Sequence, residues 1–192
     1  MMNKLLRIPN WINGYESSPV EDGWIDKFNP HNGETLCQVA DSTLVDVSSA
    51  VTAAEAAFSA WSELTPVKRG QILTDIVAAM KHRADELTDC IAVETGKPPQ
   101  DAKGEVGASI LQGEFFAGEG MRLYGRSLTS GMPGKQSFTV RQPRGIAGLI
   151  VPANTPIANI AWKTFPALIC GNTVVLKAAE DAPRIAYLFA QL

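Results

Sequence analysis

Two continuous apolar runs separated by a helical pattern are the strongest structural signal in the chain. The runs cover residues 146–151 and 173–176, and strands without polar alternation are typical of parallel sheets that are covered on both faces. Between them, Pro156 can begin a helix and Gly171 with Asn172 can turn the chain back. The segment therefore predicts a strand, a crossover helix and a parallel strand, with both strands buried.

Three helices are predicted upstream of this unit. Thr43 with Asp46 three residues later is a capping signal, and apolar residues at helical spacing follow it: Val47, Val51, Ala54, Phe58 and Trp61. A second helix is expected to begin at Thr65 and Pro66 and to run unbroken until Gly96. A third helix is predicted over residues 101–124, where repeated glycines reduce helix propensity unless close packing requires them.

The remaining segments have β character. Residues 34–39 are the clearest of several short β-like pieces among the glycines, prolines and asparagines of residues 1–42. Residues 137–141 alternate polar and apolar side chains after a turn-rich stretch, which predicts a half-exposed strand of a β-ribbon.

These patterns predict an α/β fold. An N-terminal helical region and a β-ribbon arm lead into a parallel Rossmann-like sheet that is truncated after its second βα unit. We divide the chain into a β-rich wrapping segment (1–42), a helical part (43–124), a ribbon (125–144) and an incomplete βαβα unit (145–192). Two parallel strands cannot cover their own apolar faces, so we expect further strands to complete the sheet.

Polar residues follow both strands of the predicted parallel unit. Ligands of open parallel sheets bind beyond the carboxyl ends of the strands, where residues 152–155 and 177–180 are expected to lie. Lys177 can donate hydrogen bonds to sugar hydroxyls or phosphates, whereas Glu180 can accept from a ribose 2′-hydroxyl and would repel a 2′-phosphate. The pair therefore favours NAD over NADP as a ligand.

Composition narrows the functional classes. The chain has 192 residues, 45% of them hydrophobic, with a formal net charge of −3. An acidic surface argues against nucleic-acid and anionic-membrane partners, and no apolar run is long enough to cross a bilayer. We expect a cytoplasmic location by default.

The cysteines do not form a recognisable site. Cys37, Cys90 and Cys170 are an odd number without CxxC spacing, and the chain has two histidines. We therefore expect no disulfide and no metal site. Buried thiols are usually inert, so none of the three is expected to act as a nucleophile.

Several short motifs occur in an order that resembles the aldehyde dehydrogenase superfamily. They are WING at 11–14, NPHNGE at 29–34, ETGK at 94–97, PAN at 152–154, AWK at 161–163, PAL at 166–168, GNTVVLK at 171–177 and AAEDAP at 178–183. The resemblance implies the N-terminal portion of an NAD(P)-dependent enzyme that oxidises an aldehyde to a carboxylic acid through a cysteine thioester. The family's nucleophilic cysteine and general-base glutamate lie downstream of the position equivalent to Leu192, so the resemblance implies that this chain alone is inactive.

The resemblance also implies roles for single residues. The family asparagine in the position of Asn154 stabilises the oxyanion through its side-chain amide, and the lysine in the position of Lys163 has been linked to proton relay during deacylation. Lys177 and Glu180 match the residues that hold the adenosine ribose.

Three further residues are expected beside the cofactor: Ile150, Pro152 and Ala153. Ala153 stands where the family commonly has tryptophan, which changes the expected shape of the pocket near the nicotinamide. In the family a ribbon near residues 125–144 joins the oligomerisation element, so a homo-oligomer, dimer or tetramer, is the expected partner besides the aldehyde substrate.

Each of these residues also has a structural interpretation. Asn154 could cap the crossover helix, Lys163 could lie on an exposed polar face, and Lys177 could be a solvated surface lysine. Glu180 could complement a helix dipole, and ETGK at 94–97 is interpreted as a helix stop.

Two other functions remain open at the level of the sequence. One is a CoA-acylating or reductive relative of the same superfamily, and the other is a non-catalytic module for nucleotide binding or oligomerisation.

Overall fold

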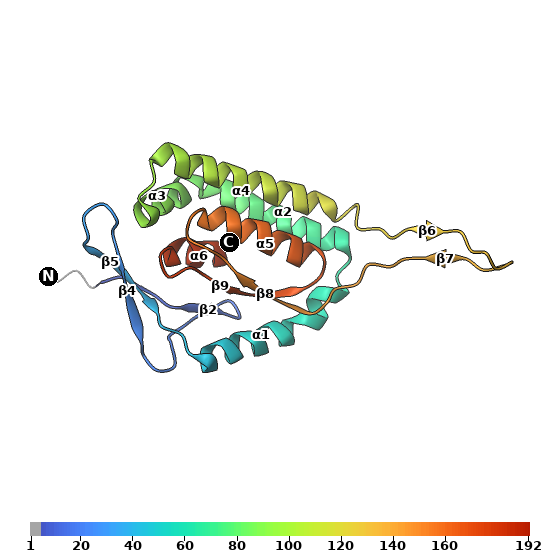
Figure 1. Cartoon of the computed structure of the whole chain (residues 1–192), viewed down its shortest axis with the longest axis horizontal. Helices are drawn as coiled ribbons and strands as arrows, with labels where there is room; N and C mark the ends of the chain where they lie inside the picture. The colour runs from blue at the N-terminus through green and yellow to red at the C-terminus, as the bar shows by residue number, and fades with distance from the viewer. Residues whose placement is uncertain (1–4) are drawn as a thin grey trace.

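The computed structural model describes residues 5–192, so the first four residues of the predicted segment 1–42 lie outside the described residues. A parallel pair of strands, β8 (Ile146–Ile150) and β9 (Thr173–Lys177), lies between two layers of helices. In Figure 1, α1 (Leu44–Glu63) runs below this pair, whereas α5 (Pro156–Ile169), α2 (Pro66–His82) and α4 (Pro99–Glu119) lie above it. The predicted α/β fold is confirmed.

The N-terminal residues form two small sheets. One has the order β1-β5-β4, and the other is the hairpin β2–β3, whose turn places Asn13 and Gly14 at φ of 53° and 81°. The strands are β1 (Arg7–Ile8), β2 (Asn10–Ile12), β3 (Tyr15–Ser17), β4 (Trp24–Phe28) and β5 (Thr35–Ala40). The hairpin contacts the C-terminal helix α6 (Pro183–Ala190), because Trp11 packs edge-on against Tyr187 at 5.7 Å between ring centroids.

The capping signal before α1 is confirmed. The carboxylate of Asp46 accepts hydrogen bonds from the backbone amide of Thr43 at 2.8 Å and from that of Val20 at 3.0 Å. The bond from Thr43 is the main reason that the pKa of Asp46 lies below its usual value. The predicted apolar stripe is only partly correct, since Ala54 is buried but Val47 and Val51 are exposed.

The single long helix predicted after Pro66 is wrong. The structure has two helices, α2 and α3 (Ala84–Thr95), separated at Arg83, whose φ of −100° and ψ of 17° are not helical. Met80 and Leu87 are both fully buried in the same core. The apolar spacing therefore continues across the break, and no glycine or proline marks it.

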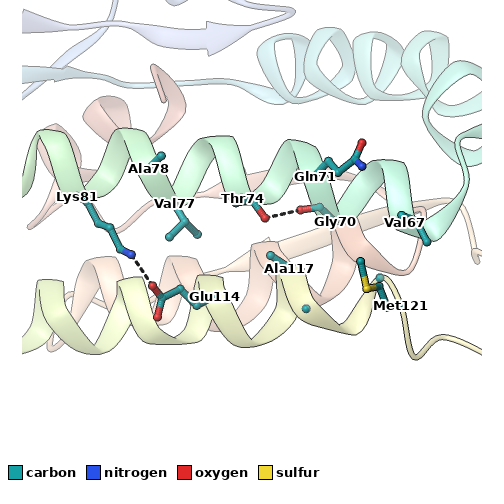
Figure 2. Close-up of a pocket in the computed structure, with 12 residues that line it drawn as sticks. Val67, Gly70, Gln71, Thr74, Val77, Ala78, Lys81, Glu114, Ala117 and Met121 are labelled. Carbon is teal, nitrogen blue, oxygen red and sulfur yellow. Dashed lines mark hydrogen bonds and ion pairs between the residues drawn. The ribbon is translucent and has the colours of Figure 1, made fainter.

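The glycines of α4 are partly explained by close packing. A Cβ atom on Gly113 would lie 2.5 Å from Val77 Cγ2 and 3.0 Å from the Phe165 ring, and one on Gly120 would lie 2.5 Å from the carbonyl oxygen of Pro66. Along the same two helices, a cavity of about 380 Å³ lies between α2 and α4, beside the ion pair of Lys81 with Glu114 (Figure 2). Gly104, by contrast, faces open space.

The segment after α4 forms the predicted ribbon. Strands β6 (Ser127–Leu128) and β7 (Ser137–Phe138) pair antiparallel, and in Figure 1 they extend away from the body of the molecule. The strand is shorter than the predicted 137–141.

The crossover unit has the predicted order and parallel register, but its strands are not buried on both faces. Ile150 is 72% exposed, and Ile146 is also exposed. A groove of about 1090 Å³ lies beside the strands, lined by residues of α1, α5, α6 and the β2 segment. Helix α1 therefore covers the second face of the strand pair only in part.

The glycines of α4 allow a matched test of the packing. Gly113→Ala is expected to lower the free energy of unfolding by about 1–3 kcal/mol, because the added methyl group overpacks the contact with Val77 and Phe165. Gly104→Ala is expected to raise it by roughly 0.4–1 kcal/mol, because alanine restricts the unfolded chain and meets no neighbour. Equilibrium denaturation measures both values, and equal effects of the two substitutions would contradict this packing.

Candidate active site at the rim of the parallel strands

The loops that follow β8 and β9 leave the sheet at the same rim. Ile150 is paired with Lys177 in the parallel register, and the backbone amide of Val151 donates to the carbonyl oxygen of Lys177 at 3.2 Å. The structure therefore brings the segment 152–155 and the segment 178–180 together, as the topology of the sequence predicts.

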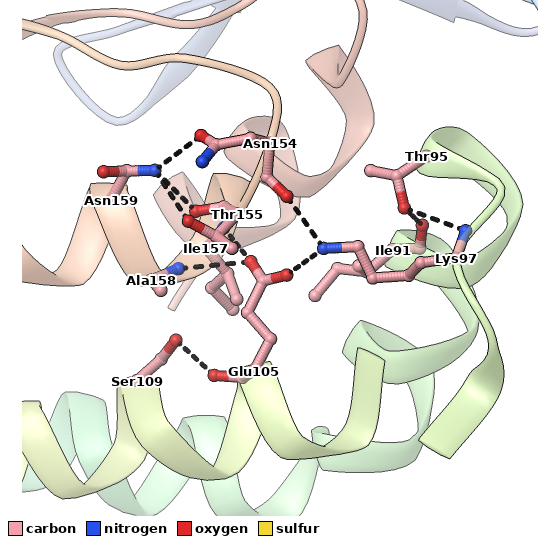
Figure 3. Close-up of polar contacts among 10 residues, drawn as sticks. All are labelled: Ile91, Thr95, Lys97, Glu105, Ser109, Asn154, Thr155, Ile157, Ala158 and Asn159. Carbon is pink, nitrogen blue, oxygen red and sulfur yellow. Dashed lines mark hydrogen bonds and ion pairs between the residues drawn. The ribbon is translucent and has the colours of Figure 1, made fainter. Parts of the chain in front are cut away.

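Asn154 lies on the first of these loops with its side chain exposed. Its Oδ1 atom accepts a hydrogen bond from Nδ2 of Asn159 at 3.3 Å, and Asn159 Nδ2 also donates to the carbonyl oxygen of Thr155 at 2.9 Å (Figure 3). The oxygen of the Asn154 amide is therefore engaged by Asn159, whereas its Nδ2 atom donates to no acceptor among residues 5–192. The side chain can therefore donate to a ligand.

The structural alternative for Asn154 is wrong. The residue at the N-cap of α5 is Thr155, and no side chain at that position bonds to the first turn. The carboxylate of Glu105, on α4, instead accepts from the backbone amides of Ile157 at 3.0 Å and Ala158 at 3.4 Å (Figure 3). A residue of another helix therefore caps α5.

Lys97 neutralises this carboxylate. Its Nζ atom lies 2.5 Å from Glu105 Oε2 and donates to the carbonyl oxygen of Asn154 at 3.0 Å. The side chains of Lys97 and Glu105 are 17% and 5% exposed, so the pair is largely desolvated. The ETGK motif ends α3 as predicted, with Gly96 in the left-handed region at φ of 73°, but Lys97 also reaches the candidate site.

Lys163 is half-buried on α5 rather than on an exposed polar face. Its ammonium donates to the carbonyl oxygen of Ile150, at the end of β8. The ammonium of Lys163, on the crossover helix, thus lies at the end of β8, where the loop that carries Asn154 begins.

Lys177 and Glu180 form an ion pair at the end of β9. Nζ and Oε2 are 2.8 Å apart, and the side chains are 63% and 62% exposed. The hydrogen bond from Lys177 is the main reason that the pKa of Glu180 lies below its usual value. An exposed pair of this kind contributes little to stability, and both groups remain accessible to a ligand.

The predicted cofactor residues divide into two groups. Ile150, Lys177 and Glu180 line the groove beside the strands. Pro152 and Ala153 lie on the adjoining loop, where Pro152 is exposed and Ala153 packs against the core. An apolar wall with one accessible ammonium and one accessible carboxylate is a donor and acceptor set that fits the ribose of an adenine nucleotide.

A second buried carboxylate caps the helix that follows β9. Glu94 accepts from the backbone amides of Arg184 at 2.7 Å and Ile185 at 2.9 Å, at the start of α6. Burial raises the pKa of Glu94, and these two amides oppose the increase. Both helices of the βαβα unit are therefore capped from the α3–α4 region.

None of the three cysteines lies at the rim. Cys37 and Cys90 are buried. Burial is the main reason that the pKa of Cys37 is raised to about 11, and it raises the pKa of Cys90 even more. Cys170 is exposed, but it follows the C-terminal end of α5, whereas the Asn154 loop precedes the N-terminal end.

No group of three His, Cys, Asp or Glu side chains among residues 5–192 could hold a metal ion. No helix in this range is long and apolar enough to span a membrane.

The sequence reasoning missed four residues that organise the site: Glu94, Lys97, Glu105 and Asn159. Glu105 carried a usable signal, because it lies between the apolar positions Ala102 and Val106 on the buried side of α4. A carboxylate on a buried helix face requires partners. The sequence does not say which amides those partners are.

Comparison with known proteins gives a consistent result. A profile described as "Aldehyde dehydrogenase family" matches residues 16–192. The chain is 39% identical over 173 residues to an α-ketoglutaric semialdehyde dehydrogenase of Bacillus subtilis, covering 90% of this chain and 36% of that protein.

Solved structures are similar throughout the chain. A crystal structure of an Escherichia coli NADP-dependent enzyme superposes with a TM-score of 0.94 at 35% identity, covering 100% of this chain and 40% of the other. A betaine aldehyde dehydrogenase of Staphylococcus aureus in complex with NAD⁺ gives a TM-score of 0.91 at 27% identity, covering 96% and 37%. The chain thus spans less than half of the length of each of these three proteins.

Proposed function

Because this chain belongs to the aldehyde dehydrogenase family, we propose that it is the N-terminal part of an NAD-dependent enzyme that oxidises an aldehyde to a carboxylic acid. The observation that carries the proposal is the Asn154 amide, which is exposed at the sheet rim and held by Asn159 at its oxygen. The nucleophilic cysteine, the general-base glutamate and most of the substrate pocket belong, in this proposal, to residues beyond this chain.

Asn154 is proposed to stabilise the oxyanion. When a nucleophile adds to an aldehyde, the carbonyl oxygen gains negative charge, and a preorganised N–H donor lowers the energy of that state. Asn159 engages Oδ1, so the Nδ2 hydrogens are the part of the amide that is left to donate to a ligand. The donor therefore needs no reorientation when the charge develops.

Lys177 and Glu180 are proposed to hold the adenosine ribose of the cofactor, and Ile150, Pro152 and Ala153 are proposed as further cofactor contacts. NAD supplies the hydride acceptor for the oxidation. The exposed ammonium and carboxylate can exchange their mutual bond for bonds to ribose hydroxyls. Glu180 is a carboxylate at neutral pH and would repel a 2′-phosphate, which favours NAD over NADP.

Lys163 is proposed to relay a proton when the acyl group is released. Its ammonium is fixed by the carbonyl oxygen of Ile150, next to the start of the Asn154 loop. A half-buried lysine at that point can donate a proton and recover it from solvent.

The ribbon is proposed to be a subunit contact of a homo-oligomer. It exposes four large apolar side chains: Leu128, Met132, Phe138 and Val140. Exposed apolar residues on a two-stranded ribbon are favourable sites for pairing with another subunit.

Substitution of Asn154 tests the chemical part of the proposal in the complete enzyme. Asn154→Ala and Asn154→Asp each remove the N–H donor, so kcat is expected to fall by roughly 100-fold or more. Steady-state kinetics with saturating aldehyde and NAD measure the effect. An unchanged kcat in both variants would remove Asn154 from the chemistry.

Substitution at the end of β9 tests the cofactor part. Lys177→Ala and Glu180→Ala are expected to raise KM for NAD more than KM for the aldehyde, because each variant removes one ribose partner. Glu180→Ala should also reduce the preference for NAD over NADP, since the repelling carboxylate is gone. Lys103→Ala, an exposed lysine on α4, is the control. Equal effects at positions 177 and 103 would contradict the assignment.

A further inference from the structure

The loop that carries Asn154 is fixed at several points by side chains from other elements. Lys97 binds the backbone carbonyl of Asn154 at 3.0 Å, just before α5 begins. Glu105 binds the amides of Ile157 and Ala158, just after α5 begins. These two residues also bind one another, so the loop is held on both sides of Pro156 by a single ion pair (Figure 3).

The burial of this ion pair makes the attachment stiff. Both side chains are largely excluded from water, and Ser109 donates to the backbone carbonyl oxygen of Glu105 at 2.8 Å on the same helix. In a low-dielectric environment such bonds are stronger than in water, and breaking one leaves a desolvated charge. The carbonyl of Asn154 therefore has a defined position relative to α4.

Asn159 fixes the side chain of the same residue. It donates to Oδ1 of Asn154 and, from the same nitrogen, to Thr155. The backbone of Asn154 is thus held by Lys97, which lies between α3 and α4, and its side chain by Asn159 of α5. Glu105 of α4 acts on the loop through Lys97 and the first amides of α5.

We propose that Lys97, Glu105 and Asn159 are positioning residues that hold the Asn154 amide in its productive orientation. This proposal rests on the proposed function of Asn154 as an oxyanion donor. The cap of α5 needs Glu105 and its neutralising partner Lys97, but it does not need the further bonds of Lys97 to the Asn154 carbonyl and of Asn159 to Asn154 Oδ1, and these bonds orient Asn154. A displacement of about 1 Å in a catalytic group can reduce the rate by roughly 100-fold.

The test is a double-mutant cycle in the complete enzyme. Lys97→Met combined with Glu105→Gln removes both charges but keeps an oxygen acceptor for the amides of Ile157 and Ala158, so the fold is expected to survive. We expect kcat to fall roughly tenfold or more, with little change in KM for NAD. In an Asn154→Ala background the same double substitution should leave kcat nearly unchanged, because there is no donor left to position.

Asn159→Ala is a second, milder variant that leaves the ion pair intact. Its effect on kcat should also disappear in the Asn154→Ala background. Lys81→Met is a control for the loss of an interhelical lysine–glutamate pair, because Lys81 makes a 2.5 Å ion pair with Glu114 between α2 and α4 (Figure 2), and this pair is more exposed than that of Lys97 and Glu105. Thermal unfolding of every variant separates loss of fold from loss of positioning.

The outcomes distinguish the two levels of the proposal. Suppose that Asn154→Ala lowers kcat, but that the effects of the positioning variants either multiply with it or equal the effect of Lys81→Met. The positioning proposal is then wrong, and the role of Lys97, Glu105 and Asn159 is only structural. If Asn154→Ala leaves kcat unchanged, the oxyanion role itself fails, and the positioning proposal fails with it. Loss of the Lys97 and Asn159 effects in the Asn154→Ala background supports both.

Discussion

Two buried carboxylates hold the βαβα unit against the helical layer of this molecule. Glu105 caps the N-terminus of α5, and Glu94 caps the N-terminus of α6. The unsatisfied amides of a helix N-terminus favour negative charge, and here the charge comes from other helices rather than from the local cap residue. The orientation of both helices of the βαβα unit is therefore set by α3 and α4. The position of each loop at the sheet rim follows from it.

The carboxylates are not equivalent in their surroundings. Glu105 is paired with Lys97, and the pair contacts the Asn154 loop directly. Glu94 has no ion-pair partner among residues 5–192 and instead receives two backbone amides and the thiol of Cys90. Removing one member of a buried ion pair costs about 3–5 kcal/mol. A single substitution at Lys97 or Glu105 is therefore expected to destabilise the fold, because it leaves the other charge buried and unpaired.

Local signals in the sequence identified the elements more completely than the contacts between them. Thr43 and Asp46 correctly marked the start of α1, and Pro156 and Gly171 correctly bounded α5. These signals act over three or four residues. The break at Arg83 left no such signal, since the apolar spacing continues through it. The hydrogen bonds that Glu94 and Glu105 accept from Arg184 and Ile157 span 90 and 52 residues, so no local pattern could reveal them.

The candidate site shows the same division. Asn154, Lys163, Lys177 and Glu180 were located from the βαβ pattern and the family resemblance, and the structure places them along one rim. The prediction that both strands are buried was wrong. A continuous apolar run is typical of a strand that other strands and helices cover on both faces, and residues 5–192 do not supply enough of them to cover β8. Ile150 is exposed for this reason.

The central claim is that Asn154 presents its amide to the oxygen of a reacting aldehyde. The most direct measurement is a crystal structure of the complete enzyme with NAD and a bound aldehyde or aldehyde adduct. In that structure, Nδ2 of Asn154 is expected to lie about 2.7–3.1 Å from the substrate oxygen, with the bond from Asn159 to Oδ1 retained. A substrate oxygen bound by other donors, with Asn154 turned away from it, would contradict the account.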